Sequence, residues 1–136
     1  MDPLGTYRKA EVEGADGARL VVVAYDGAIA FIERARQALE EGRRTEAAAL
    51  LLRAQRVVLH LASALDLEAG DVGANLHRLY TYVLRRLAAA AHECDRRALG
   101  EALHVLKELR PSWARLAEPA GAASVPVAGA GVSVRR

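Results

Sequence analysis

The sequence has little cysteine and few aromatic residues, and each shortage narrows the class of protein that it can encode. Cys94 is the only cysteine among 136 residues, so neither an intramolecular disulfide nor a zinc cluster built from cysteines can form. We therefore expect a reducing compartment, the cytosol. Only six residues are aromatic, whereas alanine and leucine are abundant. This composition favours packed helices over sheets.

A long apolar run, a signal peptide and an excess of one charge are lacking as well. The longest apolar run, 20–32, is too short to span a bilayer and contains Asp26. The first residues lack the apolar core of a signal peptide. The net charge is only +2, with arginines scattered in pairs among a similar number of carboxylates. A nucleic-acid surface usually carries a stronger, one-sided excess, so we expect neither membrane insertion nor nucleic-acid binding.

Apolar residues recur three or four positions apart in four runs, which predicts four helices over 18–41, 46–65, 72–91 and 96–116. Helices of this length joined by short loops lie antiparallel to their neighbours. The expected fold class is all-α, an antiparallel up-down four-helix bundle.

The expected organisation is a flexible N-terminal segment over 1–16, the bundle over 17–116 and a disordered tail over 117–136. The tail is rich in Gly, Pro and Ala and has no period.

Residues at the ends of the runs fit helix starts and stops. Gly42 is the expected stop of the first helix. Pro111 lacks a backbone N–H, so we expect the fourth helix to kink or restart there. Short polar side chains that can cap helix N-termini precede or open the runs. They are Asp16, Thr45, Asp71 and Asp95.

The first three runs carry more apolar surface than one bundle stripe of about 100° requires. The third has a ridge of Asn75, Leu79, Tyr82 and Arg86, at spacings i, i+4, i+7 and i+11. Two interpretations stay open: a thick core with Tyr82 at its rim, or a groove that receives an amphipathic helix of another chain.

Asp26 and Gly27 interrupt the first run. Glycine inside a helix costs about 1 kcal/mol relative to alanine, which indicates close approach of another backbone. Asp26 either faces water or pairs with a cation, and Arg85 or Arg86 is then the candidate partner.

Four motifs occur in a fixed order: Tyr-Asp-Gly at 25–27, Ala-Gln at 54–55, the block N-L-x-x-L-Y-x-Y-x-x-R-R-L over 75–87, and Trp113 near the end of the last helix. With them the chain resembles the flagellar secretion chaperone family, FliS, over roughly residues 7–116. It departs from the family where Asp16-Gly17 replaces Ser-Pro and where Pro111 precedes the tryptophan in place of a polar residue.

The resemblance implies a cytosolic export chaperone that is not an enzyme and uses no cofactor, metal or ATP. Its partner would be the disordered C-terminal segment of flagellin, which it would keep from polymerising and deliver to the flagellar type III export apparatus. The export gate protein FlhA would be a second partner, contacted with the help of Tyr7. Capping of the groove by residues 1–13 and a weak homodimer are left open.

On this interpretation the block over 75–87 turns Leu76, Tyr80, Val83 and Leu87 inward. The residues assigned to the flagellin groove are Val22, Tyr25, Ile29, Leu52, Leu59, Asn75, Leu79, Tyr82 and Arg86. The residues assigned to structural motifs are Asp26, Gly27, Gln55, Tyr80, Arg85 and Trp113.

Other functions compete with this one. A helical adaptor for a different amphipathic helix would share the whole pattern. A HEPN-type ribonuclease requires Arg and His with four to six residues between them, which the pairs Arg86–His92 and Arg53–His60 satisfy. Such a loose pattern arises easily in a chain rich in arginine, and Leu87 stands where the usual polar residue would follow the arginine. A di-metal bundle requires Glu-x-x-His on two helices, and Glu101 with His104 supplies one, so that alternative is set aside.

Overall fold

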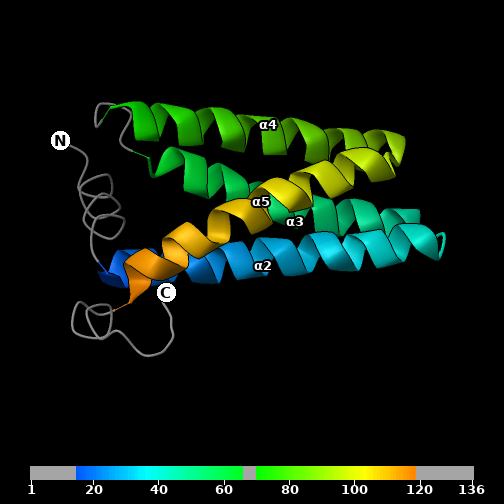
Figure 1. Ribbon diagram of the computed structural model, residues 1–136. Coiled ribbons are helices and arrows are strands. Elements are labelled where there is room, and N and C mark those ends of the chain that lie inside the picture. The colour runs from blue at the N-terminus through cyan, green and yellow to red at the C-terminus, as the bar shows by residue number, and fades with distance from the viewer. Residues whose placement is uncertain (1–14, 66–69, 119–136) are drawn as a thin grey trace.

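The fold is a bundle of four long helices, seen in a computed structural model that describes residues 15–65 and 70–118 (Figure 1). The helices are α2 (Ala15–Glu40), α3 (Arg44–Ser63), α4 (Asp71–Glu93) and α5 (Arg96–Ala117). No strand occurs in the described residues. The predicted all-α, up-down four-helix architecture is confirmed.

Parts of the predicted organisation lie outside the described residues. These are the N-terminal segment up to residue 14, which includes Tyr7, the connection at 66–69 and the tail from residue 119. The expectations of flexibility and disorder for the two outer segments therefore stay predictions.

Each helix packs against two neighbours. α2 and α4 both contact α3 and α5, so they face each other across the diagonal of the bundle. In Figure 1, α5 runs obliquely, from beside α4 where α5 begins toward α2 where it ends. Side-chain bonds agree with this path, since Arg86 of α4 pairs with Glu101 of α5 and Asp26 of α2 pairs with Arg110 further along α5.

Two helix ends follow the sequence signals. Gly42 has φ +78°, and the N–H groups of Gly42 and Arg43 donate to the carbonyls of Leu39 and Ala38. This is a Schellman motif, which requires a left-handed residue at the glycine position. At the start of α5 the Asp95 carboxylate accepts a hydrogen bond of 3.0 Å from the backbone N–H of Ala98, which is the expected cap.

Three other predicted N-caps, those of α2, α3 and α4, are wrong. Thr45 lies inside α3, which begins at Arg44 after Arg43 without a side-chain cap. Asp71 is the first residue of α4 rather than its cap, and Asp16 lies inside α2. Acidic groups in a first turn still favour the positive end of the helix dipole, so Asp16 and Asp71 keep part of the expected benefit.

The α5 helix continues through Pro111 without restarting. Proline disrupts a helix by losing one donor and crowding the carbonyl four residues back. Here Trp113, only 8% exposed, lies two residues beyond the proline and holds the last turns of α5 against the core. Tertiary packing therefore overrides the local disruption.

The core is apolar and rich in alanine, with two tyrosines at its centre. Tyr25 of α2 and Tyr80 of α4 are almost fully buried, and their hydroxyl oxygens lie 2.7 Å apart in a hydrogen bond across the bundle diagonal. The rings meet edge to face, with centroids 6.3 Å apart and 61° between the planes. Each hydroxyl is thereby satisfied, which an apolar core requires.

Burial is the main reason that the pKa values of both tyrosine hydroxyls are raised above the ordinary value of 10.0. The indole of Trp113 acts on both hydroxyls in the opposite direction. Three of the four family motifs, those of Tyr25, Tyr80 and Trp113, therefore meet at one place in the core. They hold α2, α4 and α5 together.

Candidate functional site: two apolar grooves at one end of the bundle

The two ends of the bundle differ in their surface chemistry. At one end, where α2 joins α3 and α4 joins α5, ion pairs link Arg43 to Glu41 and Glu46 and Arg86 to Asp95 and Glu101. We call this the charged end. At the opposite end, where α2 and α4 begin and α3 and α5 finish, large apolar side chains reach the surface. We call this the apolar end.

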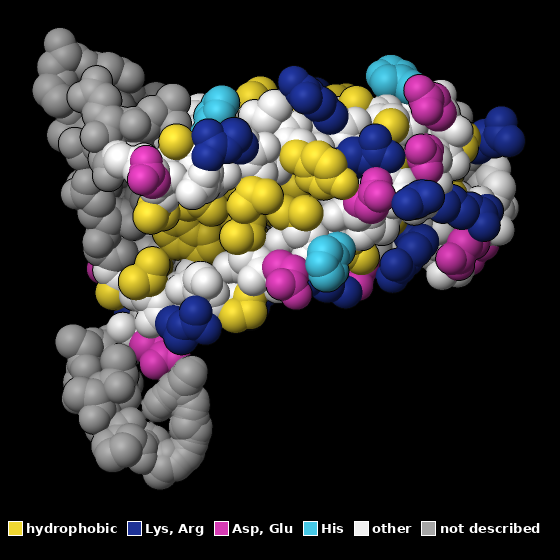
Figure 2. Space-filling model, turned by 45° about the horizontal axis from the view of Figure 1, so that its top comes forward, with side chains coloured by type: hydrophobic (Ala, Val, Ile, Leu, Met, Phe, Trp, Pro, Cys, Tyr) yellow, Lys and Arg dark blue, Asp and Glu magenta, His cyan; other side chains and the backbone are white. Residues whose placement is uncertain are grey.

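Exposed large hydrophobic side chains concentrate toward the apolar end. They include Leu20 at 53%, Val72 at 72% and Leu116 at 63% exposed. Figure 2 shows apolar side chains gathered around a hollow on this side of the molecule, with the charged groups crowded toward the other end. Contiguous exposed apolar surface of this kind marks interaction sites.

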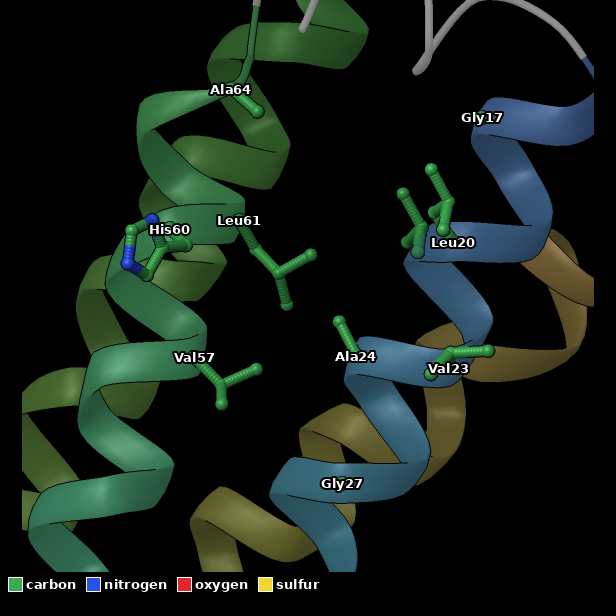
Figure 3. Close-up of a pocket in the computed structure, with 10 residues that line it drawn as sticks. Gly17, Leu20, Val23, Ala24, Gly27, Val57, His60, Leu61 and Ala64 are labelled. Atoms are coloured by element: carbon green, nitrogen blue, oxygen red, sulfur yellow. The ribbon is translucent and has the colours of Figure 1, made fainter.

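The first groove, the α2/α3 groove, has a volume of about 480 Å³. Figure 3 shows Leu20 and Ala24 of α2 facing Val57, Leu61 and Ala64 of α3. His60 is the single titratable residue in its lining. The groove is therefore a largely apolar channel between two helices.

Gly27 of α2 lines this groove, one turn beyond Ala24 (Figure 3). A Cβ added at Gly27 would meet nothing within 4 Å. The expected close approach of another backbone of the bundle is therefore wrong. The bare backbone instead forms part of an open surface.

The second groove, the α4/α5 groove, has a volume of about 350 Å³. It lies where α5 diverges from α4. Its apolar lining comprises Val72, Leu76, Leu79, Leu109, Trp113 and Leu116, and its polar lining consists of Asn75 and Ser112. No charged residue lines this groove.

Part of the predicted ridge on α4 lies in that groove. Asn75 and Leu79 line it, and Leu79 is 36% exposed. Tyr82 is 41% exposed and lies three residues after Leu79, which puts it on the same side of α4, although it does not line the groove itself. Facing inward, Tyr80, Val83 and Leu87 are buried and Leu76 is half-buried, as expected.

Other residues assigned to the groove lie elsewhere. Tyr25 is wholly buried, because its hydroxyl bonds Tyr80, so it offers no surface to a guest. Val22 and Ile29 are half-buried and packed on the core. Leu52 and Leu59 are exposed but line neither groove. Of the residues assigned to the flagellin groove, only Asn75 and Leu79 line one of these two grooves.

Arg86 lies at the charged end rather than at the edge of a groove. Its Nε is 3.0 Å from Glu101 Oε1, and its Nη2 is 3.7 Å from Asp95 Oδ2. The Nε atom is buried without an aligned acceptor, so its approach to Glu101 is an ion pair and not a hydrogen bond. Arg86 thus joins α4 to the start of α5.

The cationic partner of Asp26 is Arg110, and neither Arg85 nor Arg86. The guanidinium of Arg110 donates to both carboxylate oxygens of Asp26, at 2.6 and 3.1 Å. These hydrogen bonds lower the pKa of Asp26 and raise that of Arg110. Arg85 and Arg86 fail as partners because α4 lies across the diagonal from α2. The pair is a surface clamp between α2 and α5.

Of the remaining motif residues, Gln55 is half-buried on α3, and Arg85 is exposed on α4. The residue pairs of the rival interpretations have other contacts. Arg53 lies over the ring of Phe31 at 6.0 Å, and Glu101 pairs with Arg86 and Arg97.

In 15–65 and 70–118 no three His, Cys, Asp or Glu residues are grouped to hold a metal ion. None of the four helices is long and apolar enough to cross a bilayer.

The sequence patterns did not identify most of the residues that line the two grooves. The missed residues are Leu20, Val23, Val57 and Leu61 in the first groove, and Val72, Leu109 and Leu116 in the second. A usable signal was present, because Leu20, Val72 and Leu116 lie within a few residues of helix ends at one end of the bundle. Periodicity alone does not separate such residues from the core stripe.

The sequence of the chain is similar to those of known proteins. The family model "Flagellar protein FliS" matches residues 1–120. The chain is 32% identical over 106 residues to the flagellar secretion chaperone FliSB of Pseudomonas aeruginosa, covering 77% of this chain and 84% of the relative.

Two further relatives are the flagellar secretion chaperones FliS of Salmonella typhimurium and of Vibrio cholerae. The Salmonella protein is 31% identical over 111 residues, covering 80% of this chain and 82% of the relative. The Vibrio protein is 25% identical over 115 residues, covering 81% and 85%. The helices, the converging motifs and these matches agree: the chain belongs to the FliS family of flagellar secretion chaperones.

Proposed function

We propose that this protein binds the C-terminal segment of flagellin in the two apolar grooves, keeps it from polymerising and delivers it to the flagellar type III export apparatus. The observation that carries the proposal is the convergence of both grooves on one end of the bundle. An amphipathic helix can lay its apolar face into a groove of this kind. A guest with two apolar stretches could occupy both grooves of one molecule.

The energetics follow from the lining. Burial of apolar surface contributes about 25 cal/mol per Å², and the ordering of a disordered guest opposes it by about 2–5 kcal/mol. The α4/α5 groove has no charged lining residue, and the α2/α3 groove has only His60. Affinity should therefore depend weakly on salt and show a negative heat-capacity change.

Contact with FlhA involving Tyr7 rests on the resemblance alone, since Tyr7 lies outside the described residues. The assignment of the protein as a chaperone rather than an enzyme rests on its family.

The test is isothermal titration of the full chain with the C-terminal segment of flagellin from the same organism. We expect a one-to-one complex, a negative heat-capacity change and a gain of helix in the peptide. No binding to the folded protein would contradict the proposal. The fold would then serve another client, as in the helical-adaptor alternative.

Matched leucine variants locate the binding surface. Leu20→Asp in the α2/α3 groove and Leu79→Asp in the α4/α5 groove should each weaken binding at least about tenfold, because a charge is costly in an apolar interface. Leu52→Asp is the control. The exposed fraction of Leu52, 48%, is similar to the 53% of Leu20, but Leu52 lines neither groove. Equal loss in all three variants would contradict the groove assignment.

Tyr82→Ala tests the ridge on α4. We expect it to weaken flagellin binding more than it lowers the melting temperature, because the ring is 41% exposed beside Leu79. Loss of fold without a selective loss of binding would show that Tyr82 belongs to the core rim.

A further inference from the structure

We propose that the segment following α5, residues 119–136, binds in the α4/α5 groove of its own chain and thereby competes with any guest for that groove. The inference does not depend on the identity of the client. It rests on the chemistry of the segment, on the point where α5 delivers it and on the lining of the groove.

The segment is unusual for its lack of charge. From Pro119 to Val134 the sequence PAGAASVPVAGAGVSV contains no Asp, Glu, Lys, Arg or His. Segments that remain in water are typically rich in charged and polar residues, whereas this one offers only apolar and small side chains over that stretch. Apolar surface of this composition is more stable against another apolar surface than in water.

The spacing of its valines fits an extended strand. Val125 and Val127 are two residues apart, and so are Val132 and Val134. In an extended chain each pair projects to one side. Pro126 between the first two lacks a backbone N–H and disfavours a helix there. We therefore assign the two valine pairs as the groups that enter the groove.

The segment starts at the groove. α5 supplies Leu109, Trp113 and Leu116 to the lining, and the chain leaves α5 at Glu118 with an extended backbone, φ −70° and ψ 138°. The six residues Pro119 to Ser124 can span up to about 20 Å when extended. That is more than the roughly 11 Å over which residues 72–79 of α4 line the groove, so the chain has length enough to turn back along it.

The α4/α5 groove is favoured over the α2/α3 groove for two reasons. α5 contributes to the lining of the former alone, so the shorter connection gives the higher effective concentration. Its lining is also free of titratable groups, which matches a segment without charge, whereas the α2/α3 groove includes His60.

Occupation of the groove by its own chain would affect a guest in a defined way. The guest must displace the valine pairs before it contacts Leu79 and Leu116. Its apparent affinity is therefore its intrinsic affinity multiplied by the fraction of molecules whose groove is free. We expect removal of the valine contacts to raise guest affinity severalfold in this groove. This last consequence rests on the proposed function, and the test below does not.

The test is disulfide trapping in the full chain with Cys94 replaced by serine. One variant carries Leu79→Cys and Val127→Cys, and its matched control carries Leu20→Cys and Val127→Cys. Both leucines are exposed and lie in different grooves. Under mild oxidation at low protein concentration, we expect an intramolecular cross-link in the first variant at least about tenfold faster than in the control, measured by non-reducing electrophoresis and peptide mapping.

Each other outcome overturns the proposal. Equal rates in the two variants would show that the segment samples the surface without preference. A cross-linked dimer would show that the groove receives the segment of a second copy. No cross-link in either variant, with both thiols reactive toward a soluble reagent, would show that the segment does not reach the groove.

Trp113 gives an independent readout, because it is the only tryptophan in the chain and lines the groove. Val125→Asp with Val127→Asp leaves the four helices untouched, and should increase acrylamide quenching of Trp113 at least about twofold. Ala122→Asp with Ala123→Asp, which adds the same charge outside the valine pairs, should leave quenching unchanged. Unchanged quenching in the valine variant would contradict the proposal, because it would mean that the valine pairs do not cover Trp113.

Discussion

The charged and apolar ends of the bundle are built from the same four helices, but their side chains make different kinds of contact. At the charged end, short connections and ion pairs around Arg43 and Arg86 close the bundle. At the apolar end, α5 diverges from α4 and leucines and valines line open grooves. Buried contacts run along the whole bundle, including Tyr25, Tyr80 and Trp113, whereas the large exposed apolar side chains gather toward one end. A residue's burial, and not its end of the bundle alone, therefore decides how much it contributes to stability.

The largest expected contrast is between two leucines of α5. Leu99 is fully buried near the charged end, whereas Leu116 is 63% exposed at the apolar end. Leu99→Ala should lower the free energy of unfolding by about 3 kcal/mol, since it removes buried methyl groups and leaves a cavity. Leu116→Ala should lower it by less than about 0.5 kcal/mol. Urea unfolding of both variants measures the contrast, and equal losses would break the comparison.

The buried hydrogen bond between Tyr25 and Tyr80 tests how much a polar contact across the bundle diagonal contributes to stability. Tyr80→Phe leaves the Tyr25 hydroxyl buried without its partner and should cost about 1–2 kcal/mol. The double Phe variant should be more stable than the sum of the two single losses predicts, because both polar groups are removed together. Tyr82→Phe, at an exposed position, is the control and should be neutral.

The same pair predicts an alkaline limit. The pKa values of Tyr25 and Tyr80 lie above 10.0 in the folded state because both hydroxyls are buried. The unfolded chain therefore releases these protons first, so their stabilising contribution is complete below pH 10 and declines as the pH rises above it. In urea titrations between pH 8 and pH 11, the double Phe variant should lose less stability than the wild type. A parallel decline would contradict this origin.

Substitutions in the two loops of the charged end should change stability by smaller amounts and in opposite directions. Both contain a left-handed residue, Gly42 with φ +78° and Cys94 with φ +52°. Gly42→Ala should destabilise by about 1 kcal/mol, which is the cost of that conformation for a residue with a Cβ, since the added Cβ itself meets nothing. Cys94→Gly should stabilise by about 0.5–1 kcal/mol for the converse reason. Thermal unfolding checks the signs, and a less stable Cys94→Gly protein would contradict the strain.

The smallest effect concerns the clamp between Asp26 and Arg110. Both side chains are more than one-third exposed, so Asp26→Asn should cost only about 0.5 kcal/mol at pH 7. The pKa of Asp26 is lowered below 3.8 chiefly by the hydrogen bonds from Arg110. The contribution is therefore present above that pH and is lost below it. The difference in stability between wild type and variant should shrink as the pH falls below 3.8, and a difference that stays constant there would contradict the ion-pair origin.

Some of the site could be predicted from the sequence. The spacing of Asn75 and Leu79 places both on one face of α4, and both line a groove. The same reasoning put Tyr25 on a groove, because a helical stripe does not say whether it faces solvent or the opposite helix. Val22 and Ile29 failed similarly: their stripe on α2 packs on the core. The partner of Asp26 was missed because the arrangement of helices around the bundle is not written in any single helix.

The sequence by itself determined the four helices, the Gly42 stop, the Asp95 cap and the inward face of α4, because these depend on neighbours within a few residues along the chain. Only the tertiary structure decided where the grooves lie, that Tyr25 meets Tyr80 across the diagonal and that Arg110 clamps Asp26. Those features depend on the order in which helices pack and on the oblique path of α5. Contacts between residues 55 or 84 positions apart arise only when the whole bundle has assembled.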